Sequence, residues 1–309
     1  MNTAPARVGA IDIGTNSTNL LIADGSGPLR RRLEVTRLGK GVDASRRLDP
    51  EAIERTVAML AEYRKELDAH GATAVRAIAT SASRDATNRD EFFDRAEAVL
   101  GVRPELISGD EEGRLAFLGA SGVVSSTHEP PWGMLDIGGG STELVLGDLD
   151  HREGSSIDVG SVRITELFLA SDPPRPEELS NAIGMVSDHL EDVVRAVPGL
   201  LEGAPMIGIA GTITVVAAVE LGLTNFDPDR IDGMRLSREA AEDVFRTLAT
   251  EPLAARIHNP GLPRERADVI VGGCCVLVAV MRRLHLPELI VTVRSILDGV
   301  TSELLEREV

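Results

Sequence analysis

Short apolar runs alternate along the chain with longer segments in which apolar residues recur every three or four positions. The runs at 8–13 and 20–24 are joined by a Gly-Thr-Asn-Ser turn, which predicts a β-hairpin, and a third strand is expected at about 29–36. A helix is predicted from Asp49 to about His70, because Asp suits the N-cap and Pro50 the first turn. The same pattern predicts strands at 74–82 and 104–108, a helix at 88–100, and a further helix that ends near Gly122.

The second half of the chain repeats this order. The segment "SSTHEPP" (125–131) is the best linker candidate, since its residues favour turns. A duplicated three-strand meander followed by alternating helices and strands is typical of two similar α/β domains that face a cleft. The predicted strands are 132–136, 142–147, 151–158, 205–210 and 288–292, and the predicted helices are 160–169, 177–196, one from 212, 238–249, 265–285 and 296–307.

The repeat is also visible in the residues themselves. "AIDIGTNSTNLLIAD" (10–24) and "MLDIGGGSTELVLGD" (134–148) share seven of fifteen residues when the first is shifted by 124 positions. Asp12 falls on Asp136, whereas Asn19 falls on Glu143. Thr15 and Asn16 fall on Gly139 and Gly140. The two copies therefore share a backbone pattern and differ at three polar positions.

Composition limits the class of protein. The 309 residues exceed the usual size of one core, and 43% hydrophobic with 26% charged residues is ordinary globular composition. No run of eighteen apolar residues and no N-terminal signal pattern occurs. Cys274 and Cys275 are neighbours in an apolar stretch, which favours packing over a disulfide. A cytoplasmic, reducing location is expected.

The net charge of −17 argues against a nucleic-acid binder, whose affinity depends on neutralising phosphates. The charge is uneven, because residues 1–50 hold eight basic and five acidic side chains. A basic patch on an acidic body can collect a small or linear polyanion. For the run Arg30, Arg31 and Arg32, a solvated strand face remains an equal alternative.

The Gly-rich turns predict phosphate binding. A strand that ends in Asp, followed by a tight Gly-Ser/Thr turn, directs several backbone N–H groups at one spot, and glycine lets the backbone approach a ligand closely. A third element, "GIAGTITVVAAV" (208–219), ends a strand and begins a helix, whose N-terminus suits an anion. The predicted phosphate-binding residues are Gly14, Thr15, Asn16, Ser17, Gly138, Gly139, Gly140, Ser141, Thr142, Gly208, Gly211 and Thr212, and Thr18 is expected to donate its hydroxyl as Ser17 does.

These three elements resemble the phosphate loops of the actin-like ATPase superfamily. More narrowly, the whole chain resembles the exopolyphosphatase / guanosine pentaphosphate phosphohydrolase family in its short two-domain form. The resemblance implies an α/β fold of two duplicated actin-like (ribonuclease H-like) domains that flank an interdomain cleft, at 1–124 and 125–309, with the helix at about 296–309 packing back on the first domain. It depends on "AIDIGTNSTNLLIA", "ATSASRDATN", "ISGDEEGRLAFLG", "LDIGGGSTELVLG", "DVGSVRITE", "GIAGTIT" and "ERADVIVGG".

The resemblance assigns catalytic roles to Glu112, Arg84 and Glu143. Ser108 and Glu111 have the spacing of a capping box at a helix start, which explains Glu111 but leaves Glu112 without a structural reason. Glu112 matches the family's catalytic glutamate, which orients and deprotonates the attacking water, with Glu143 as its partner. Arg84 matches an arginine that contacts the attacked phosphoryl group, and a helix-capping or surface arginine is the alternative.

The resemblance also implies a metal site formed by Asp136, Glu143 and Asp12. Such acids hold a divalent ion directly or through water, and Mg²⁺ suits carboxylate and phosphate oxygens while keeping several waters. Mn²⁺ is the second choice, and a monovalent cation is a further candidate. The alternatives are an Asp12 that caps its own turn and a Glu143 on a solvated strand face.

The expected function is therefore a Mg²⁺-dependent exopolyphosphatase that releases terminal phosphate from inorganic polyphosphate. The alternatives are hydrolysis of guanosine pentaphosphate, an ATP-dependent kinase or chaperone, and a polyphosphate or alarmone sensor with weak turnover. No metal-ligand spacing of histidines, Walker loop or G-x-S-x-G elbow occurs. Arg163 and Arg266 are candidates for a wider substrate channel, the Val293-Arg294-Ser295 turn departs from the family pattern, and family members often form homodimers.

Overall fold

The computed structural model describes residues 6–308, and the chain divides into two compact units. Unit 1 comprises Met1–Gly119 and Ile296–Val309, and unit 2 comprises Ala120–Ser295. The division falls at Gly119, five residues before the expected boundary at 124. The turn-rich segment 125–131 lies in unit 2, as do Trp132 and His128, whose Nε1 and carbonyl are hydrogen-bonded at 2.9 Å.

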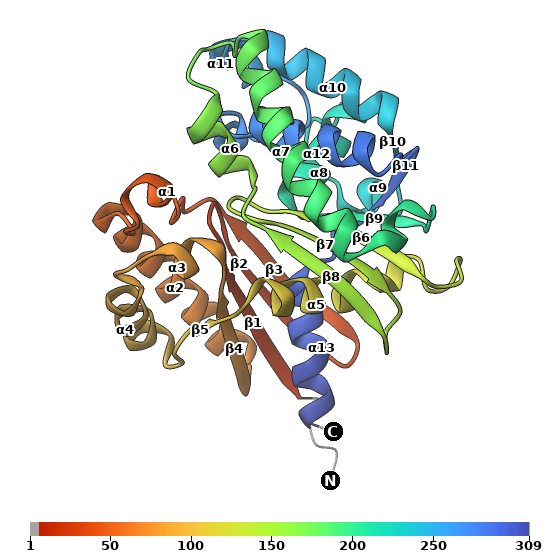
Figure 1. Ribbon diagram of the computed structural model, residues 1–309. Helices are drawn as coiled ribbons and strands as arrows, with labels where there is room; N and C mark the ends of the chain where they lie inside the picture. The colour runs from red at the N-terminus through yellow and green to blue at the C-terminus, as the bar shows by residue number, and fades with distance from the viewer. Residues whose placement is uncertain (1–5, 309) are drawn as a thin grey trace. The chain divides into compact units, whose positions relative to one another are not determined.

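Unit 1 contains a five-stranded mixed sheet (Figure 1). The first three strands form the predicted antiparallel meander, and the last two run parallel to β1. Its order is β3-β2-β1-β4-β5. The strands are β1 (Arg7–Ile13), β2 (Thr18–Asp24), β3 (Gly27–Glu34), β4 (Ala74–Ala79) and β5 (Glu105–Leu106).

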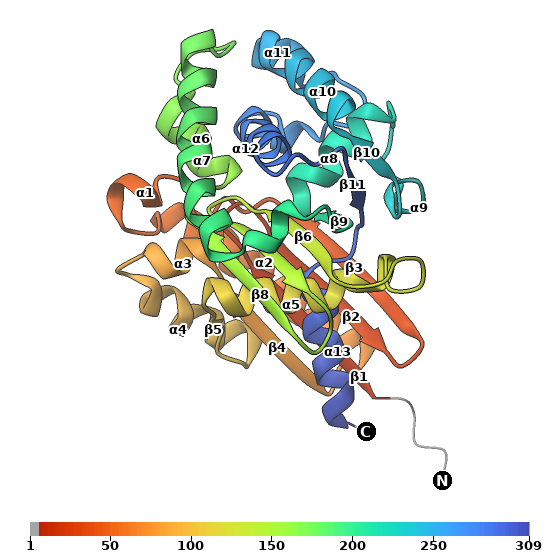
Figure 2. The same ribbon diagram turned by 45° about the vertical axis from the view of Figure 1, so that its right-hand side comes forward.

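Helices cover both faces of this sheet. Helices α2 and α4 pack against each other on one face, and the C-terminal helix α13 packs against β1 and β2 on the other (Figures 1 and 2). The Asp49 Oδ1 accepts from the backbone N of Glu51 and of Ala52, so the predicted N-cap is confirmed. The helices are α1 (Val42–Ser45), α2 (Pro50–His70), α3 (Ser81–Asp85), α4 (Arg89–Leu100), α5 (Gly109–Ala120) and α13 (Ile296–Glu308).

Unit 2 repeats this topology. Its sheet has the order β10-β11-β9-β6-β7-β8, so β8-β7-β6-β9-β11 follows the same path as β3-β2-β1-β4-β5, and β10 is an added edge strand. The duplicated α/β architecture predicted from the sequence is confirmed. The strands are β6 (Trp132–Ile137), β7 (Thr142–Gly147), β8 (Arg152–Ile157), β9 (Met206–Ile209), β10 (Arg235–Ser237) and β11 (Glu288–Val291).

The helices of unit 2 surround α12, which is apolar and buried. Cys274 and Cys275 lie within it as free, buried thiols, as their apolar context predicted. The helix predicted at 265–285 begins only at Ile270, because a 3₁₀ turn at Arg264–Arg266 precedes it. The helices are α6 (Ser161–Phe168), α7 (Pro176–Ala196), α8 (Ala210–Glu220), α9 (Pro228–Ile231), α10 (Arg238–Thr250), α11 (Leu253–Arg256) and α12 (Ile270–Arg283).

One predicted strand is too long, and several short elements were not predicted. The strand expected at 74–82 ends at Ala79, and the apolar run continues into α3, because buried residues of a short helix resemble a buried strand in the sequence. The elements α1, α9, α11 and β10 were not predicted, since four residues or fewer show no periodicity. Among residues 6–308, no helix combines the length and the apolar character that a membrane span requires.

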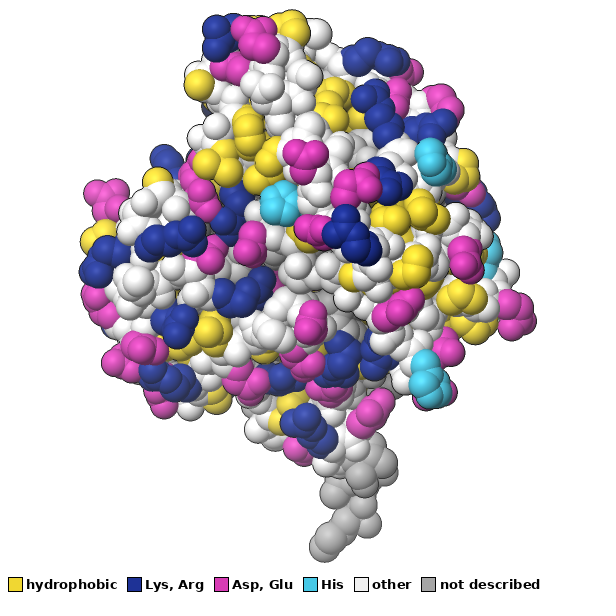
Figure 3. Space-filling model, viewed as in Figure 1, with side chains coloured by type: hydrophobic (Ala, Val, Ile, Leu, Met, Phe, Trp, Pro, Cys, Tyr) yellow, Lys and Arg dark blue, Asp and Glu magenta, His cyan; other side chains and the backbone are white. Residues whose placement is uncertain are grey.

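The arginine run on β3 is neutralised by acids within unit 1. Arg30 and Arg32 both bind Glu66 of α2, at 2.7 and 2.5 Å, and Arg31 binds Asp298 of α13 at 2.6 Å. In Figure 3, basic and acidic side chains are interspersed over the visible face. These ion pairs explain the run as a strand whose charges are paired, and they supply no support for a polyanion patch there.

Close packing between α6 and α12 depends on a glycine. A Cβ on Gly272 would lie 2.3 Å from the Thr165 Oγ1 and 2.6 Å from the Ser161 carbonyl oxygen, closer than real Cβ atoms approach. By contrast, a Cβ on Gly184, in the exposed surface of α7, meets no atom within 4 Å.

We therefore expect Gly272→Ala and Gly184→Ala, two helix substitutions in the same unit, to change stability in opposite directions. Overpacking at Gly272 should cost about 1–3 kcal/mol of the free energy of unfolding. At Gly184 the removal of backbone freedom should add about 0.5–1 kcal/mol. Urea unfolding followed by circular dichroism measures both, and a stabilised Gly272→Ala variant would contradict the packing described here.

Candidate active site

The two Gly-rich turns have the same geometry. The Gly14 N donates to the Ser17 carbonyl at 2.9 Å, and the Gly138 N donates to the Ser141 carbonyl at 3.0 Å. A Cβ on Gly14 would lie 3.1 Å from the Ser17 oxygen, and one on Gly138 would lie 3.2 Å from the Ser141 oxygen. The sequence repeat therefore corresponds to one backbone structure built twice.

Segments that follow each hairpin occupy the carbonyl groups of the turns. In unit 1, the Gly39 N donates to the Thr15 carbonyl at 2.8 Å. In unit 2, the Val162 N donates to the Gly139 carbonyl at 2.8 Å, and a Cβ on Gly160 would lie only 2.5 Å from the Gly139 carbonyl oxygen. The carbonyl oxygens that accept these bonds point at the protein, so they would not repel an anion bound at the turn. Such an arrangement suits a backbone site for phosphate.

Two hydroxyls of the predicted site serve the structure instead. Thr18 is fully buried and pairs with the Thr36 hydroxyl at 2.9 Å. Thr142 is fully buried and its hydroxyl donates to the Val159 carbonyl at 2.5 Å. The prediction that Thr142 and Thr18 donate to phosphate is wrong, because β-strand side chains alternate and these two point into the core.

Other hydroxyls near the first turn remain available. The Oγ1 of Thr15 and the Oγ of Ser81 and of Ser83 are buried and find no hydrogen-bond partner within the part of the chain that the structure describes. Gly39 packs against both Thr15 and Ala82 of α3, because a Cβ on Gly39 would meet both side chains. Thr15 and α3 therefore lie against the same segment of the chain. A buried polar group without a partner costs free energy, so such groups point to a ligand or to water.

The polar difference between the two repeats has a structural consequence. Asp12 is opposite Asn19 in the β1–β2 register, and the Asn19 Nδ2 donates to the Asp12 Oδ2 at 3.0 Å. In unit 2 the equivalent position pairs Asp136 with Glu143, and the Glu143 Oε1 accepts from the Ser156 hydroxyl at 2.8 Å. Like charges opposite each other on neighbouring strands are unfavourable, so this pair suits a bound cation.

Asp12 retains its proton far more readily than an ordinary aspartate. Burial raises the pKa of Asp12 from 3.8 to about 7; the hydrogen bond from Asn19 opposes this shift, and the charge of Glu112 adds to it. Asp12 is therefore close to Glu112 electrostatically as well as to the first Gly-rich turn. A divalent cation would favour the ionised form of Asp12.

Glu112 and Arg84 form the predicted pair. The Arg84 Nη1 donates to the Glu112 Oε2 at 2.7 Å and to the Ile107 carbonyl at 3.1 Å. Burial raises the pKa of Glu112 above its usual value of 4.5, and the charge and hydrogen bond of Arg84 oppose that rise. A buried carboxylate with an elevated pKa beside an arginine is typical of a general base.

Thr80 is a site residue that sequence reasoning missed. Its side chain is hydrogen-bonded to Glu112, which lowers the pKa of that carboxyl, and its carbonyl accepts from the Arg84 N at 3.1 Å. The available signal was its place directly after the buried strand β4, since the ends of parallel strands meet at one edge of a sheet.

The third predicted element has strained backbone and a buried arginine. Ala210, at the start of α8, has φ 65°, which is uncommon for a residue with a side chain. The Arg266 guanidinium lies against Gly211, where a Cβ would be 1.6 Å from its Nη1, and burial lowers the pKa of Arg266. Within the described residues this guanidinium makes no hydrogen bond, so it is available to an anion at the N-terminus of α8.

The Arg163 Nε donates to the Gly140 carbonyl at 3.1 Å and so supports the second turn. Its predicted place in a wider substrate channel stays a prediction.

The chemistry of the acids also limits the metal. No group of three or more His, Cys, Asp or Glu side chains among residues 6–308 is arranged to hold an ion. One or two carboxylates completed by water and phosphate oxygens is the usual coordination of Mg²⁺, so the acids fit that ion.

Comparisons with known proteins agree with this geometry. The model of the Ppx/GppA phosphatase family matches residues 22–308. The chain is 41% identical over 323 residues to Exopolyphosphatase 2 of Mycobacterium tuberculosis, and the match covers 97% of this chain and 99% of that protein.

Solved structures have the same fold. A crystal structure of an exopolyphosphatase-like protein matches with a TM-score of 0.94 at 35% identity, over 98% of this chain and 100% of the other. The Aquifex aeolicus member of the Ppx/GppA family matches with a TM-score of 0.79 at 31% identity, over 99% of this chain and 100% of the other. The predicted pair of actin-like α/β domains is thereby confirmed. The chain belongs to the Ppx/GppA phosphatase family and is a hydrolase of the phosphatase type.

Proposed function

We propose that the protein is a Mg²⁺-dependent exopolyphosphatase that removes the terminal phosphate from inorganic polyphosphate. The observation that supports this proposal most directly is the partly buried Glu112–Arg84 pair, at 2.7 Å, together with the buried hydroxyls of Thr15, Ser81 and Ser83, which have no hydrogen-bond partner among residues 6–308. The relatives described as exopolyphosphatases support the substrate class.

In the proposed reaction Glu112 accepts a proton from water while the water oxygen attacks the terminal phosphorus. The bond from that phosphorus to the bridging oxygen breaks, and the shortened chain leaves with the bridging oxygen as its new terminus. General-base assistance of this kind contributes about 10²–10⁴ in rate. The remainder comes from positioning and from neutralising the phosphoryl charge.

Arg84 links the base to the phosphoryl group. Both of its side-chain hydrogen bonds come from Nη1, so Nη2 and Nε remain for phosphoryl oxygens. A planar guanidinium can bind a carboxylate and a phosphate at the same time, which an ammonium does less well. We assign Arg84 to hold Glu112 and the attacked phosphoryl group together.

The Gly-rich turns and the acids complete the proposal. Backbone N–H groups of both turns, with Thr15, Ser141 and the α8 N-terminus beside Arg266, receive the polyphosphate oxygens. Asp136 with Glu143 in unit 2, and Asp12 in unit 1, are the acids that would offer oxygen ligands to Mg²⁺, with Mn²⁺ as a substitute. When bound, such an ion neutralises negative charge on the phosphates. The buried free thiols of α12 favour a reducing compartment, so we also propose a cytoplasmic location.

We expect purified protein with Mg²⁺ to release phosphate from polyphosphate, and to release little from ATP. Guanosine pentaphosphate is the alternative substrate of the same residues, and a sensor would bind polyphosphate with little turnover. Phosphate release from long polyphosphate, short polyphosphate, guanosine pentaphosphate and ATP, measured in parallel, separates these possibilities. Faster release from guanosine pentaphosphate than from polyphosphate would overturn the proposed substrate.

Glu112→Gln should lower kcat by about 10²–10⁴, because Gln keeps the shape of the side chain but cannot accept the proton. The matched control is Asp110→Asn on the same first turn of α5, which is exposed and should keep normal kcat. Since the base acts when ionised, the activity of the wild type should fall as the pH drops through the raised pKa of Glu112. Near-normal turnover by Glu112→Gln in a phosphate-release assay would refute its role as base.

Asp12 should couple stability to pH in metal-free protein. Its pKa in the folded state, about 7, exceeds the reference value of 3.8, so the stabilisation by its proton is complete below about pH 4 and is lost as the pH rises through 7. Asp12→Asn avoids that loss and should gain up to about 4 kcal/mol over the wild type at pH 8.

The control for this experiment has the opposite sign. Hydrogen bonds from Ser26 lower the pKa of Asp24, at the other end of the same hairpin. Asp24→Asn should therefore be less stable than the wild type at pH 8, and this difference should fade as the pH falls below 4. Urea unfolding in EDTA across this range tests both variants, and a pH-independent effect of Asp12→Asn would contradict the raised pKa.

A further inference from the structure

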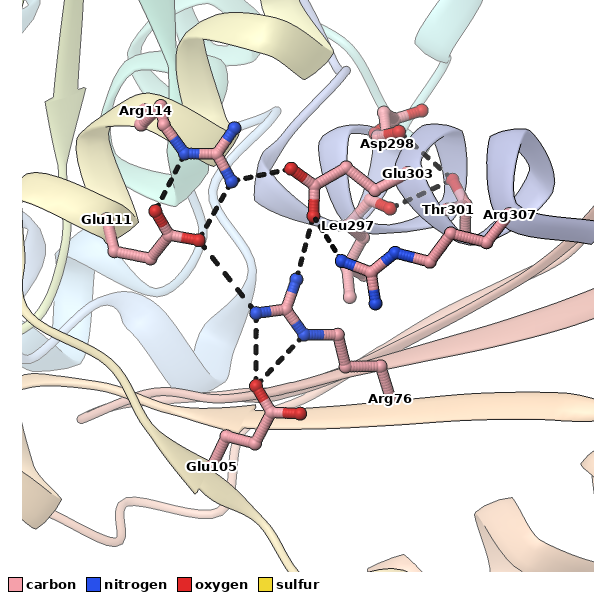
Figure 4. A network of polar contacts seen from close by, with 9 residues as sticks. All are labelled: Arg76, Glu105, Glu111, Arg114, Leu297, Asp298, Thr301, Glu303 and Arg307. Atoms are coloured by element: carbon pink, nitrogen blue, oxygen red, sulfur yellow. Dashed lines mark hydrogen bonds and ion pairs between the residues drawn. The ribbon is translucent and has the colours of Figure 1, made fainter.

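The C-terminal helix α13 joins an ion-pair network with the helix that carries Glu112 (Figure 4). Glu303 of α13 accepts from the Arg114 Nη2 at 2.6 Å and from the Arg76 Nη1 at 3.0 Å. Arg114 also binds Glu111 through Nε and Nη2, at 2.7 and 2.8 Å. Arg76 in turn lies 3.0 Å from Glu105 and 3.8 Å from Glu111.

The network adds a second role to the capping residue Glu111. The predicted capping contact is present, since the Glu111 N donates to the Ser108 Oγ at 3.2 Å. The Glu111 carboxylate, however, is bound to Arg114 and approached by Arg76. Glu111 therefore connects the first turn of α5 to β4 and α13.

The segment that follows β4 also holds Glu112. Strand β4 carries Arg76 and leads directly into Thr80 and Arg84, the two residues bound to Glu112. Glu111 and Glu112 are consecutive on α5, so their side chains point about 100° apart around the helix axis. The first turn of α5 is thus held from one side by Arg84 and from the other by Arg76 and Arg114.

Helix α13 touches α5 through the backbone as well. A Cβ on Gly299 would lie 2.0 Å from the Leu115 carbonyl oxygen, so the helices approach as closely as glycine permits. Glu303 is only 18% exposed and bridges Arg76 and Arg114, and Arg307 lies 3.9 Å from it. Its removal leaves Arg76 and Arg114 with the acids of β5 and α5 alone and takes away their link to α13.

We propose that Glu303 is a positioning residue for catalysis, which fixes the first turn of α5, and with it the Glu112 carboxylate, through Arg114 and Arg76. This proposal rests on the proposed function, in which Glu112 acts as the base. Without Glu303, Arg114 and Arg76 keep their contacts with Glu111 and Glu105 but lose their tie to α13, so the turn that carries Glu112 is free to shift relative to Arg84. Small misplacements of a catalytic group lower the rate of the chemical step strongly.

The test compares Glu303→Gln with a matched variant, Glu66→Gln. Glu66 also bridges two arginines of unit 1, Arg30 at 2.7 Å and Arg32 at 2.5 Å, and is 20% exposed, but its network does not reach α5. Both variants lose a similar bridge and should show similar decreases in melting temperature. Only Glu303→Gln should lower kcat, by about ten- to hundredfold, while KM stays within about twofold of the wild type.

Hydrogen–deuterium exchange supplies a readout that needs no activity. Amides of the first turn of α5 should exchange faster in Glu303→Gln and unchanged in Glu66→Gln. A kcat that is normal in Glu303→Gln, or equally reduced in both variants, would overturn the proposal, as would a change confined to KM. If the wild type releases no phosphate from any substrate, the proposed function fails; unchanged exchange in α5 refutes the positioning role independently.

Discussion

The burial of the Glu112 carboxylate is the constraint on which the candidate site depends. Removing a carboxylate from water is costly unless a cation and hydrogen-bond donors compensate. Arg84 and Thr80 supply that compensation, and both come from the segment directly after β4. A carboxylate held in this way keeps a raised pKa and a defined position, and both properties suit a base that must take a proton from water.

The duplication explains how the rest of the phosphate chemistry was built. The hairpin with its Gly-rich turn occurs twice. The same hydrogen bond closes both turns, from Gly14 N to the Ser17 carbonyl at 2.9 Å and from Gly138 N to the Ser141 carbonyl at 3.0 Å, so both copies keep the same backbone structure. The side chain opposite the strand-end aspartate diverged. Asn19 stabilises Asp12 by donating to it, whereas Glu143 adds a second negative charge beside Asp136. The repeats thus share the backbone of the turn but differ in the charge beside the strand-end aspartate.

Sequence reasoning succeeded where the pattern is local and long. The hairpins, α2 with its Asp49 cap, and the Gly-rich turns all follow from periodicity and turn chemistry within a few residues. It failed where the outcome depends on distant contacts. Thr142 appeared available to phosphate, but its hydroxyl binds Val159, and Glu111 appeared to be a cap residue, but its carboxylate binds Arg114. Thr80 was missed because only the fold brings it to Glu112.

The topology gives a reason for the position of α13. Helix α5 follows β5, the fifth strand of the first repeat, and α13 follows β11, its counterpart in the second repeat. The final helix of the second repeat nevertheless belongs to unit 1, where Gly299 meets Leu115 and Glu303 meets Arg114. Two equivalent helices therefore share one set of ion pairs, and the chain that leaves unit 2 at Ser295 ends beside the helix that carries Glu112. The contacts of Glu112 with α13 run through α5 and do not involve the Gly-rich turns.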